Sequence, residues 1–331
     1  MKHIVSGIQP TGSINIGTYL GSIKNFVALQ NSYKDHHFYL FIADLHAITI
    51  PKDRLKLRKM IKELAAIYLA CGLKEERLSL FIQSEIPAHS QMSYLIQCFT
   101  YMGELERMTQ YKDKAQKQAS VSSALFTYPT LMAGDILLYD AEYVPVGDDQ
   151  KQHLELTRDI AQRINHRFED FFKVPKPLIP KVGARIMSLA DPTVKMSKSD
   201  ANVKSRIELL DDDNIIRKRI MSAVTDSEGK IYYDKVNKPG LANLMTLMGA
   251  VKNESLAAIE AAYQDKTYQT FKEDLARLVI DHLRPIKERY QELIKSDKLD
   301  DILEKGRIEA EKIARKKVMK FNHKLGLGRK K

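Results

Sequence analysis

Hydrophobic and polar positions follow two different patterns along the chain. In roughly the first 190 residues, short apolar runs typical of buried strands take turns with longer amphipathic stretches typical of helices. The apolar runs cover residues 4–8, 38–43, 78–83 and 142–146, and the amphipathic stretches cover 19–31, 55–71, 122–138 and 150–167. Strands that alternate with helices predict an α/β fold, a doubly wound parallel sheet covered on both faces. In such sheets ligands bind beyond the carboxyl ends of the strands.

The second pattern, after about residue 202, is almost purely helical. Aspartates at 211–213 suit the positive N-terminal end of one helix, and Pro239 suits the first turn of another over 241–251. Helical spacing continues until Pro285, which is expected to kink or end its helix. A last helix is expected over 301–320. We therefore expect a catalytic domain over 1–200, a smaller α-helical domain over 201–300, and a basic helix and tail over 301–331 that packs back on the first domain.

The composition of the 331 residues narrows the class of protein. Hydrophobic residues make up 44% and charged residues 29%, as in soluble globular chains. No apolar run approaches the length of a membrane span, and residues 1–7 lack the hydrophobic core of a signal peptide, so we expect a cytoplasmic protein. Cys71 and Cys98 match no zinc or redox spacing, and the histidines are scattered. We expect a buried thiol at Cys71 and no structural metal.

The net charge of +11 is unevenly distributed. The last 31 residues hold eleven Lys or Arg against four Asp or Glu, and no acidic residue follows Arg315. A basic tail favours a polyanionic partner such as a nucleic acid. A solvated helix end explains it equally well, because cations suit the C-terminal end of a helix. Both interpretations stay open at this point.

A glycine-bearing loop at residues 6–18 joins the first strand to a helix that begins near Gly17. Glycines allow close approach of the backbone, and a helix N-terminus offers N–H groups to phosphate. Gly7 and Gly12 have the spacing of a Walker A loop, but Ser13 stands where that motif requires lysine. The P-loop interpretation is therefore excluded, and a simple tight turn remains the plainer one.

A second motif, Lys195-Met196-Ser197-Lys198-Ser199, ends the α/β region. Lysine charge and serine hydroxyls suit a loop that grips a polyphosphate, although most basic loops are only solvated. The two motifs together resemble the class I aminoacyl-tRNA synthetases. The family's His-Ile-Gly-His motif corresponds to Asn15-Ile16-Gly17-Thr18, in which both histidines are replaced and Gly17 is kept. Asn and Thr still form hydrogen bonds but carry no imidazole charge.

Further blocks resemble the bacterial tryptophanyl branch of that class along essentially the whole chain. They cover residues 7–12, 103–110, 128–139, 144–153 and 180–189. The resemblance implies a Rossmann-like catalytic domain and a helical anticodon-binding domain. It also implies a two-step reaction that uses L-tryptophan, tRNA(Trp) and ATP, with Mg²⁺ arriving as part of the ATP complex. The expected assembly is a homodimer.

The same resemblance assigns site residues. Lys114, Lys195 and Lys198 would neutralise the triphosphate. The ATP site would comprise Gln9, Pro10, Thr11, Gly17, Thr18, Gly147, Asp148, Asp149, Ile186, Lys195, Met196, Ser197, Lys198 and Ser199. Asp135 would accept the indole N–H in an apolar pocket walled by Tyr128, Met132, Val144 and Val146. From the residues alone, Asp135 is a carboxylate in an apolar helix that needs a donor, whether substrate or structural partner.

Three alternatives stay open beside this interpretation. A tyrosyl-tRNA synthetase shares the fold and the second motif, although the blocks around Asp135 and Gly147 argue against it. A non-catalytic RNA-binding paralogue is consistent with the altered first motif but not with the intact Lys195 and Lys198. A nucleotidyltransferase would lack the helical domain and the basic tail.

Overall fold

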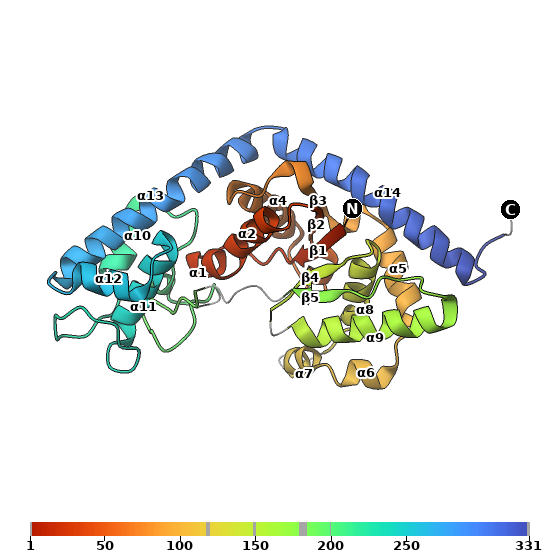
Figure 1. The fold of residues 1–331 in the computed structure, drawn as a ribbon, viewed down its shortest axis with the longest axis horizontal. Coiled ribbons are helices and arrows are strands. Elements are labelled where there is room, and N and C mark those ends of the chain that lie inside the picture. The colour runs from red at the N-terminus through yellow and green to blue at the C-terminus, as the bar shows by residue number, and fades with distance from the viewer. Residues whose placement is uncertain (1, 117–119, 148–149, 179–183, 199, 330–331) are drawn as a thin grey trace.

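Two lobes lie under an arch of two long helices in the computed structural model, which describes residues 2–116, 120–147, 150–178, 184–198 and 200–329 (Figure 1). The larger lobe contains a parallel five-stranded sheet in the order β3-β2-β1-β4-β5. Its strands are β1 (Lys2–Ile8), β2 (His36–Ile42), β3 (Leu78–Ile82), β4 (Tyr143–Pro145) and β5 (Lys176–Leu178). The predicted doubly wound α/β fold is confirmed. The sequence pattern missed β5, which contains Lys176 and Pro177 and is mostly exposed, whereas the equally short β4 lies in an apolar run.

Helices cover both faces of the sheet, which explains why the strands are apolar on both sides. One face packs on α1 (Ile16–Thr18), the π-helical turn η1 (Tyr19–Ile23), α2 (Lys24–Ser32) and α4 (Arg54–Ala70). The other packs on α5 (Ala88–Gln97), α8 (Ser123–Leu137) and α9 (Lys151–Phe168). Short helices α3 (Asp44–Ala47), α6 (Met102–Glu106) and α7 (Thr109–Ala115) complete this lobe. Along β1, Ile4 enters the first core and Val5 the second.

The smaller lobe is helical. It consists of α10 (Asp213–Met221), α11 (Pro239–Lys252), α12 (Leu256–Tyr263) and the first turns of α13 (Tyr268–Lys295). Pro239 stands in the first turn of its helix, as the sequence predicts. The expectation that Pro285 could end its helix is wrong, because α13 continues to Lys295. Beyond the proline, Tyr290 and Leu293 are buried, and α13 packs against α4 of the larger lobe, so tertiary contacts hold these turns.

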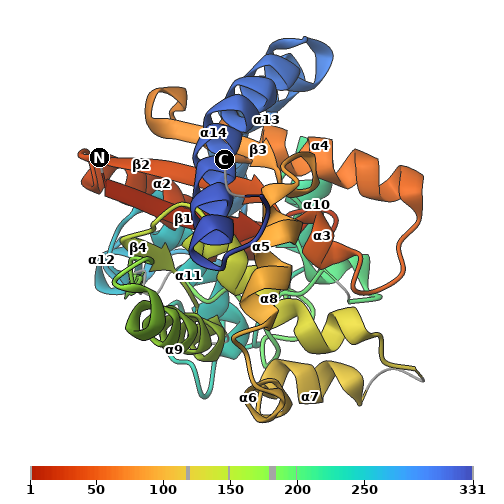
Figure 2. The same ribbon diagram turned by 90° about the vertical axis from the view of Figure 1, so that its right-hand side faces the viewer.

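The last helix, α14 (Lys298–Lys324), lies along β3 and α5 of the larger lobe (Figures 1 and 2). The two backbones approach so closely at Gly306 that a Cβ there would be 2.1 Å from the carbonyl oxygen of Leu80. Further along, the buried Lys317 donates to Asp140 Oδ1 (2.6 Å) and to the carbonyl of Phe171 (2.8 Å). This lysine of the basic tail is therefore part of the packing.

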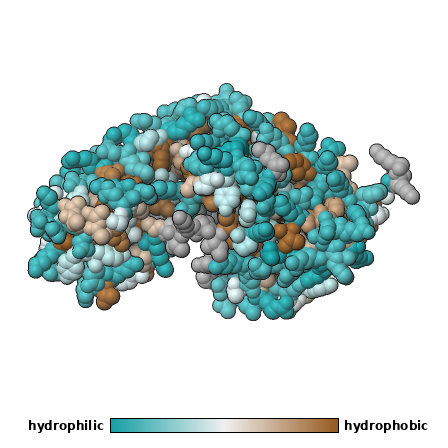
Figure 3. Space-filling view, viewed as in Figure 1, coloured by the Kyte–Doolittle hydropathy of each residue, from teal (hydrophilic) through white to brown (hydrophobic). Residues whose placement is uncertain are grey.

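The surface seen in Figure 3 is mostly hydrophilic along the arch of α13 and α14. Within the described ranges, no helix combines the length and the apolar character that a bilayer span requires. No group of three or more His, Cys, Asp or Glu residues in those ranges is placed to hold a metal ion. Cys71 is partly buried, and burial raises the pKa of its thiol to about 12, whereas Cys98 is exposed.

Candidate active site

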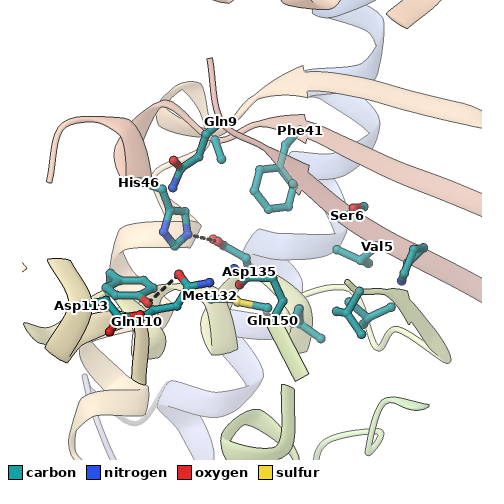
Figure 4. A pocket seen from close by; sticks show the side chains of 17 residues that line it. Val5, Ser6, Gln9, Phe41, His46, Gln110, Asp113, Met132, Asp135 and Gln150 are labelled. Atoms are coloured by element: carbon teal, nitrogen blue, oxygen red, sulfur yellow. Dashed lines mark hydrogen bonds and ion pairs between the residues drawn. The ribbon is translucent and has the colours of Figure 1, made fainter. Parts of the chain in front are cut away.

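A cavity of about 660 Å³ opens where β1, β2 and β4 end, between the sheet and α8 (Figure 4). This is the edge at which a parallel sheet is expected to bind ligands. Six residues that the sequence assigned to substrate or ATP line it: Gln9, Tyr128, Met132, Asp135, Val144 and Val146. The sequence analysis missed other lining residues, among them Phe41, His46, Gln110, Asp113 and Gln150. His46, Gln110 and Asp113 come from the short helices α3 and α7, Phe41 from the end of β2, and Gln150 from the residue before α9.

Asp135 is the centre of a buried hydrogen-bond network at one wall of the cavity. Its Oδ1 accepts from His89 Nδ1 (2.7 Å) and Gln83 Nε2 (2.8 Å), and its Oδ2 accepts from His46 Nε2 (2.9 Å). Burial alone raises the pKa of Asp135, but the hydrogen bonds from His46 and His89 outweigh it and hold the pKa below its usual value. The carboxylate is therefore charged. Gln83 Nε2 lies within hydrogen-bond distance of both its oxygens (2.8 and 2.9 Å), so the three donors leave room for at most one further donor from the cavity.

The network extends away from the cavity on one side and along its wall on the other. His89 Nε2 lies 2.8 Å from the hydroxyl of Tyr139, which is buried in the core behind. His46, which lines the cavity, contacts the ring of Tyr128 edge to face. Tyr128 in turn places its hydroxyl 2.6 Å from His153 Nε2. His46 and His153 thus fix the position of the Tyr128 ring in the cavity wall.

A second group of predicted residues meets at the start of α1. Gly17 is buried under the loop that follows residue 184, and a Cβ on it would lie 3.5 Å from Ile186 Cβ and 3.6 Å from Met196 Cβ. Asn15, which replaces the first histidine of the family motif, caps the helix by accepting from the Thr18 N–H at 2.9 Å. A Cβ at these distances would make ordinary van der Waals contacts with Ile186 and Met196, and its tightest neighbour would be Asn15 Oδ1 at 3.3 Å, so position 17 is closely packed between the loop and the helix.

The lysines of the second motif stand at the edge of this group. The N–H of Met196 donates to the carbonyl of Ile186 (3.1 Å). Lys195 and Lys198, on either side of Met196 in the sequence, are exposed. Partial burial and the nearby charge of Lys52 lower the pKa of Lys198, and Glu208 opposes this effect. Lys52 lies in the loop before α4, and no sequence pattern indicated a role for it. Its ammonium group adds a cation from outside the motif to the charges of Lys195 and Lys198.

The comparisons with known proteins decide the family. The family model "tRNA synthetases class I (W and Y)" matches residues 2–284. A tryptophan–tRNA ligase of Oceanobacillus iheyensis is 57% identical to this chain over 330 residues, and the match covers both chains completely. A tryptophan–tRNA ligase of Bacillus subtilis is 54% identical over 327 residues, and the match covers 99% of this chain and 98% of the relative. The chain belongs to the class I tryptophanyl-tRNA synthetases.

Solved structures of tryptophanyl-tRNA synthetases have the same architecture along nearly the whole chain. The enzyme of Mycoplasma pneumoniae is 37% identical with a TM-score of 0.84, and the match covers 99% of this chain and 98% of that one. The enzyme of Campylobacter jejuni, solved in complex with ADP and tryptophan, is 34% identical with a TM-score of 0.86, covering 98% and 100%. The matches include both lobes and the last helix.

The remaining predicted site residues lie apart from the main cavity. Pro10 is buried, Thr11, Thr18 and Gly147 are exposed, Ser197 is partly buried, and none of them lines that cavity. Asp148, Asp149 and Ser199 lie outside the described residues, as does the side chain of Lys114, whose backbone is in α7. Two clusters thus emerge: one around Asp135 and one around Gly17.

Proposed function

We propose that the protein is a tryptophan–tRNA ligase, and that the cavity around Asp135 binds L-tryptophan while the cluster around Gly17 binds ATP. The observation that carries this proposal is a charged, buried carboxylate in the wall of a largely apolar cavity. It occurs in a chain that tryptophan–tRNA ligases match from end to end. ATP as substrate is supported by the Campylobacter relative, which was solved with ADP and tryptophan.

The cavity suits an indole in size and chemistry. Met132, Val144 and Val146 supply apolar contacts, and Tyr128 closes one side. The indole N–H is a donor without acceptor capacity, so it needs an acceptor when it is buried. Asp135 supplies one, and the hydrogen bonds from His46, Gln83 and His89 fix where its oxygens lie. A ring without a donor would leave the carboxylate less well satisfied.

The reaction has two steps, and in neither does a side chain form a covalent bond. A carboxylate oxygen of tryptophan attacks the α-phosphorus of Mg-ATP, forms tryptophanyl-adenylate and expels pyrophosphate. A hydroxyl of the terminal ribose of tRNA then attacks the acyl carbon and releases AMP. Lys195 and Lys198, together with Lys114, would stabilise the charge that develops on the leaving phosphates. Mg²⁺ enters with the triphosphate and is held mainly by its oxygens and water.

The other partners follow from the same activity. The substrate of the second step is tRNA(Trp), and we assign its anticodon to the α10–α13 lobe. We also propose a homodimer in the cytoplasm. Tyr94 of α5 and Tyr101 and Met102 at the start of α6 are exposed by 67%, 62% and 64% in a single chain. Exposed large side chains on the consecutive helices α5 and α6 support a protein interface in this region.

The direct test of the ligase activity is charging of tRNA(Trp). The purified protein should attach labelled tryptophan to tRNA(Trp) in the presence of Mg-ATP and should leave tRNA(Tyr) uncharged with tyrosine. Charging of tRNA(Tyr) with tyrosine would replace the proposal by a tyrosyl enzyme. Specific binding of tRNA(Trp) without any charging would favour the non-catalytic RNA-binding paralogue.

A further inference from the structure

A second cavity, of about 590 Å³, lies on the other side of the larger lobe, between α14 and the amino ends of β1 and β2. His3, His37 and Tyr39 form its floor, and Lys312, Lys316 and Lys320 reach it from α14. His3 and Gly7 stand at opposite ends of β1, about 13 Å apart at the usual strand rise. The tryptophan cavity opens at Gly7, so the two cavities lie at opposite edges of the sheet.

The acidic groups of this second cavity are already engaged. Glu309 accepts a hydrogen bond from Ser79 Oγ (2.9 Å), and Asp140 accepts one from Lys317 Nζ (2.6 Å). By contrast, Lys312, Lys316 and Lys320 are exposed and have no ion pair or hydrogen bond with any residue that the structure describes. The Asp140–Lys317 pair is neutral and Glu309 keeps its negative charge, but the three lysines outweigh it, so the cavity is net positive.

The spacing of the three lysines indicates what kind of anion would fit. They stand four residues apart on α14, which places their successive Cα atoms about 6 Å apart along the helix axis. A single carboxylate would meet only one of them. A chain of phosphates, whether in an organic polyphosphate or in an RNA backbone, presents charges in a row and would meet all three. Ile313 and Leu138 add apolar wall beside them.

We propose that this cavity is a second binding site, specific for ligands with consecutive phosphate groups. Lys312, Lys316 and Lys320 supply the charge, and His3, His37 and Tyr39 form the wall against which the ligand lies. The site does not rest on the proposed function, because none of its residues lines the tryptophan cavity or belongs to the second motif.

Histidine ring signals offer a test, since His3 and His37 lie in the cavity wall and no ligand at the other edge of the sheet can touch them. The protein would be labelled with ¹³C-histidine and titrated with tripolyphosphate. The two signals would be assigned through His3→Gln and His37→Gln. Both signals should shift saturably. Lys312→Gln/Lys316→Gln should weaken binding at least tenfold.

A matched control removes the same charge from α14 outside the cavity. Lys305→Gln/Arg315→Gln changes two exposed cations that do not line it and should keep the affinity of the parent protein. Equal affinities of the two double variants, or signals that do not move, would overturn the site. Pyrophosphate exchange should be unchanged in both variants, so a failure of the site is distinguishable from a failure of the proposed function.

The source of the phosphates is decided by a second titration, with uncharged tRNA. If RNA occupies the site, tRNA should move the same two signals and tripolyphosphate should compete with it. If the site is for a free organic polyphosphate, tripolyphosphate alone should move them. Both results support a phosphate site. The absence of a response to either ligand contradicts it, as equal affinities of the two double variants would.

Discussion

The carboxylate of Asp135 serves two purposes at once, because it faces the cavity and also anchors three buried donors. Asp135→Asn should therefore weaken both the stability of the fold and the binding of tryptophan. Loss of one charged partner in a buried network costs about 3–5 kcal/mol, so the melting temperature should fall. The KM for tryptophan should rise and the preference for tryptophan over phenylalanine should narrow, because the acceptor for the indole N–H is lost. Steady-state pyrophosphate exchange and calorimetry on one preparation measure both effects.

His89→Gln separates the two purposes. His89 bonds to Asp135 from the side away from the cavity and does not line it. This variant should lower the melting temperature and keep the preference for tryptophan. If Asp135→Asn loses no more selectivity than His89→Gln does, the carboxylate only stabilises the fold.

Lys195 is expected to act in the transition state rather than in binding of tryptophan. Charge accumulates on the pyrophosphate only as it leaves, and an interaction made only then lowers kcat and kcat/KM together. Lys195→Ala should slow adenylate formation at least tenfold in a stopped-flow experiment while the Kd for tryptophan stays unchanged. Lys204→Ala, an exposed lysine of the following segment, is the control. An undiminished activation rate in Lys195→Ala would remove this lysine from the mechanism.

At the level of single residues, the sequence predicted six of the cavity's 17 lining residues and missed the donors that hold Asp135. Asp135 stood out because a carboxylate in an apolar helix needs a donor. Nothing in the sequence showed that the donors would be His46, Gln83 and His89, which come from three separate segments. Their role depends on tertiary folding, which no local pattern encodes.

Among the elements, the contact between α14 and β3 leaves no room for a side chain at Gly306. A Cβ there would lie 2.1 Å from backbone oxygen, which cannot rotate away, so the helix must shift. Gly306→Ala should therefore destabilise the protein by about 1–3 kcal/mol, as overpacking of cores does. Chemical denaturation measures the change. Gly103→Ala in α6 is the control, because its nearest neighbour would be 3.7 Å away. Equal stability of both variants would contradict the close packing.

The junction between the lobes contains a titratable group. Tyr19 of the π-helical turn η1 places its hydroxyl 3.0 Å from His282 Nε2 of α13, and burial, together with Lys24, lowers the pKa of His282. Between that lowered pKa and about 6.5, the unfolded chain binds the proton more readily, so stability falls as pH is lowered. The melting temperature should drop between about pH 7 and 5, and the drop should be smaller in His282→Asn. An equal fall of the melting temperature with pH in the parent protein and in His282→Asn would contradict this role of His282.

Elements with long periodic patterns were predictable, whereas short ones were not. The strands β1 to β4 and the long helices α4, α8, α9 and α11 appear where the periodicity places them. The short helices α6 and α7 carry too few positions to show a period, and β5 was missed because its Lys176 and Pro177 interrupt any apolar run. Pro285 suggested a possible helix end that packing of α13 on α4 overrides.

At the scale of the whole molecule, the proposal assigns the chemistry to the sheet lobe and the anticodon to the helical lobe. Gly17, Ile186 and Met196 lie where the sheet lobe meets the loop that leads into the helical lobe. Asn243 of α11 holds this loop through both backbone groups of Met187, at 2.8 and 2.9 Å. The proposed ATP site is therefore built jointly by both lobes, whereas the proposed tryptophan cavity belongs to the sheet lobe alone.

The central claim is that this cavity selects tryptophan for activation by ATP. The most direct measurement is exchange of labelled pyrophosphate into ATP, run with each of the twenty amino acids in turn. The account predicts exchange that is at least a thousandfold faster with tryptophan than with tyrosine or phenylalanine, on the scale by which hydrogen-bonding sites reject ligands that lack the matching group. Exchange that is fastest with tyrosine, or no exchange with any amino acid, would contradict it.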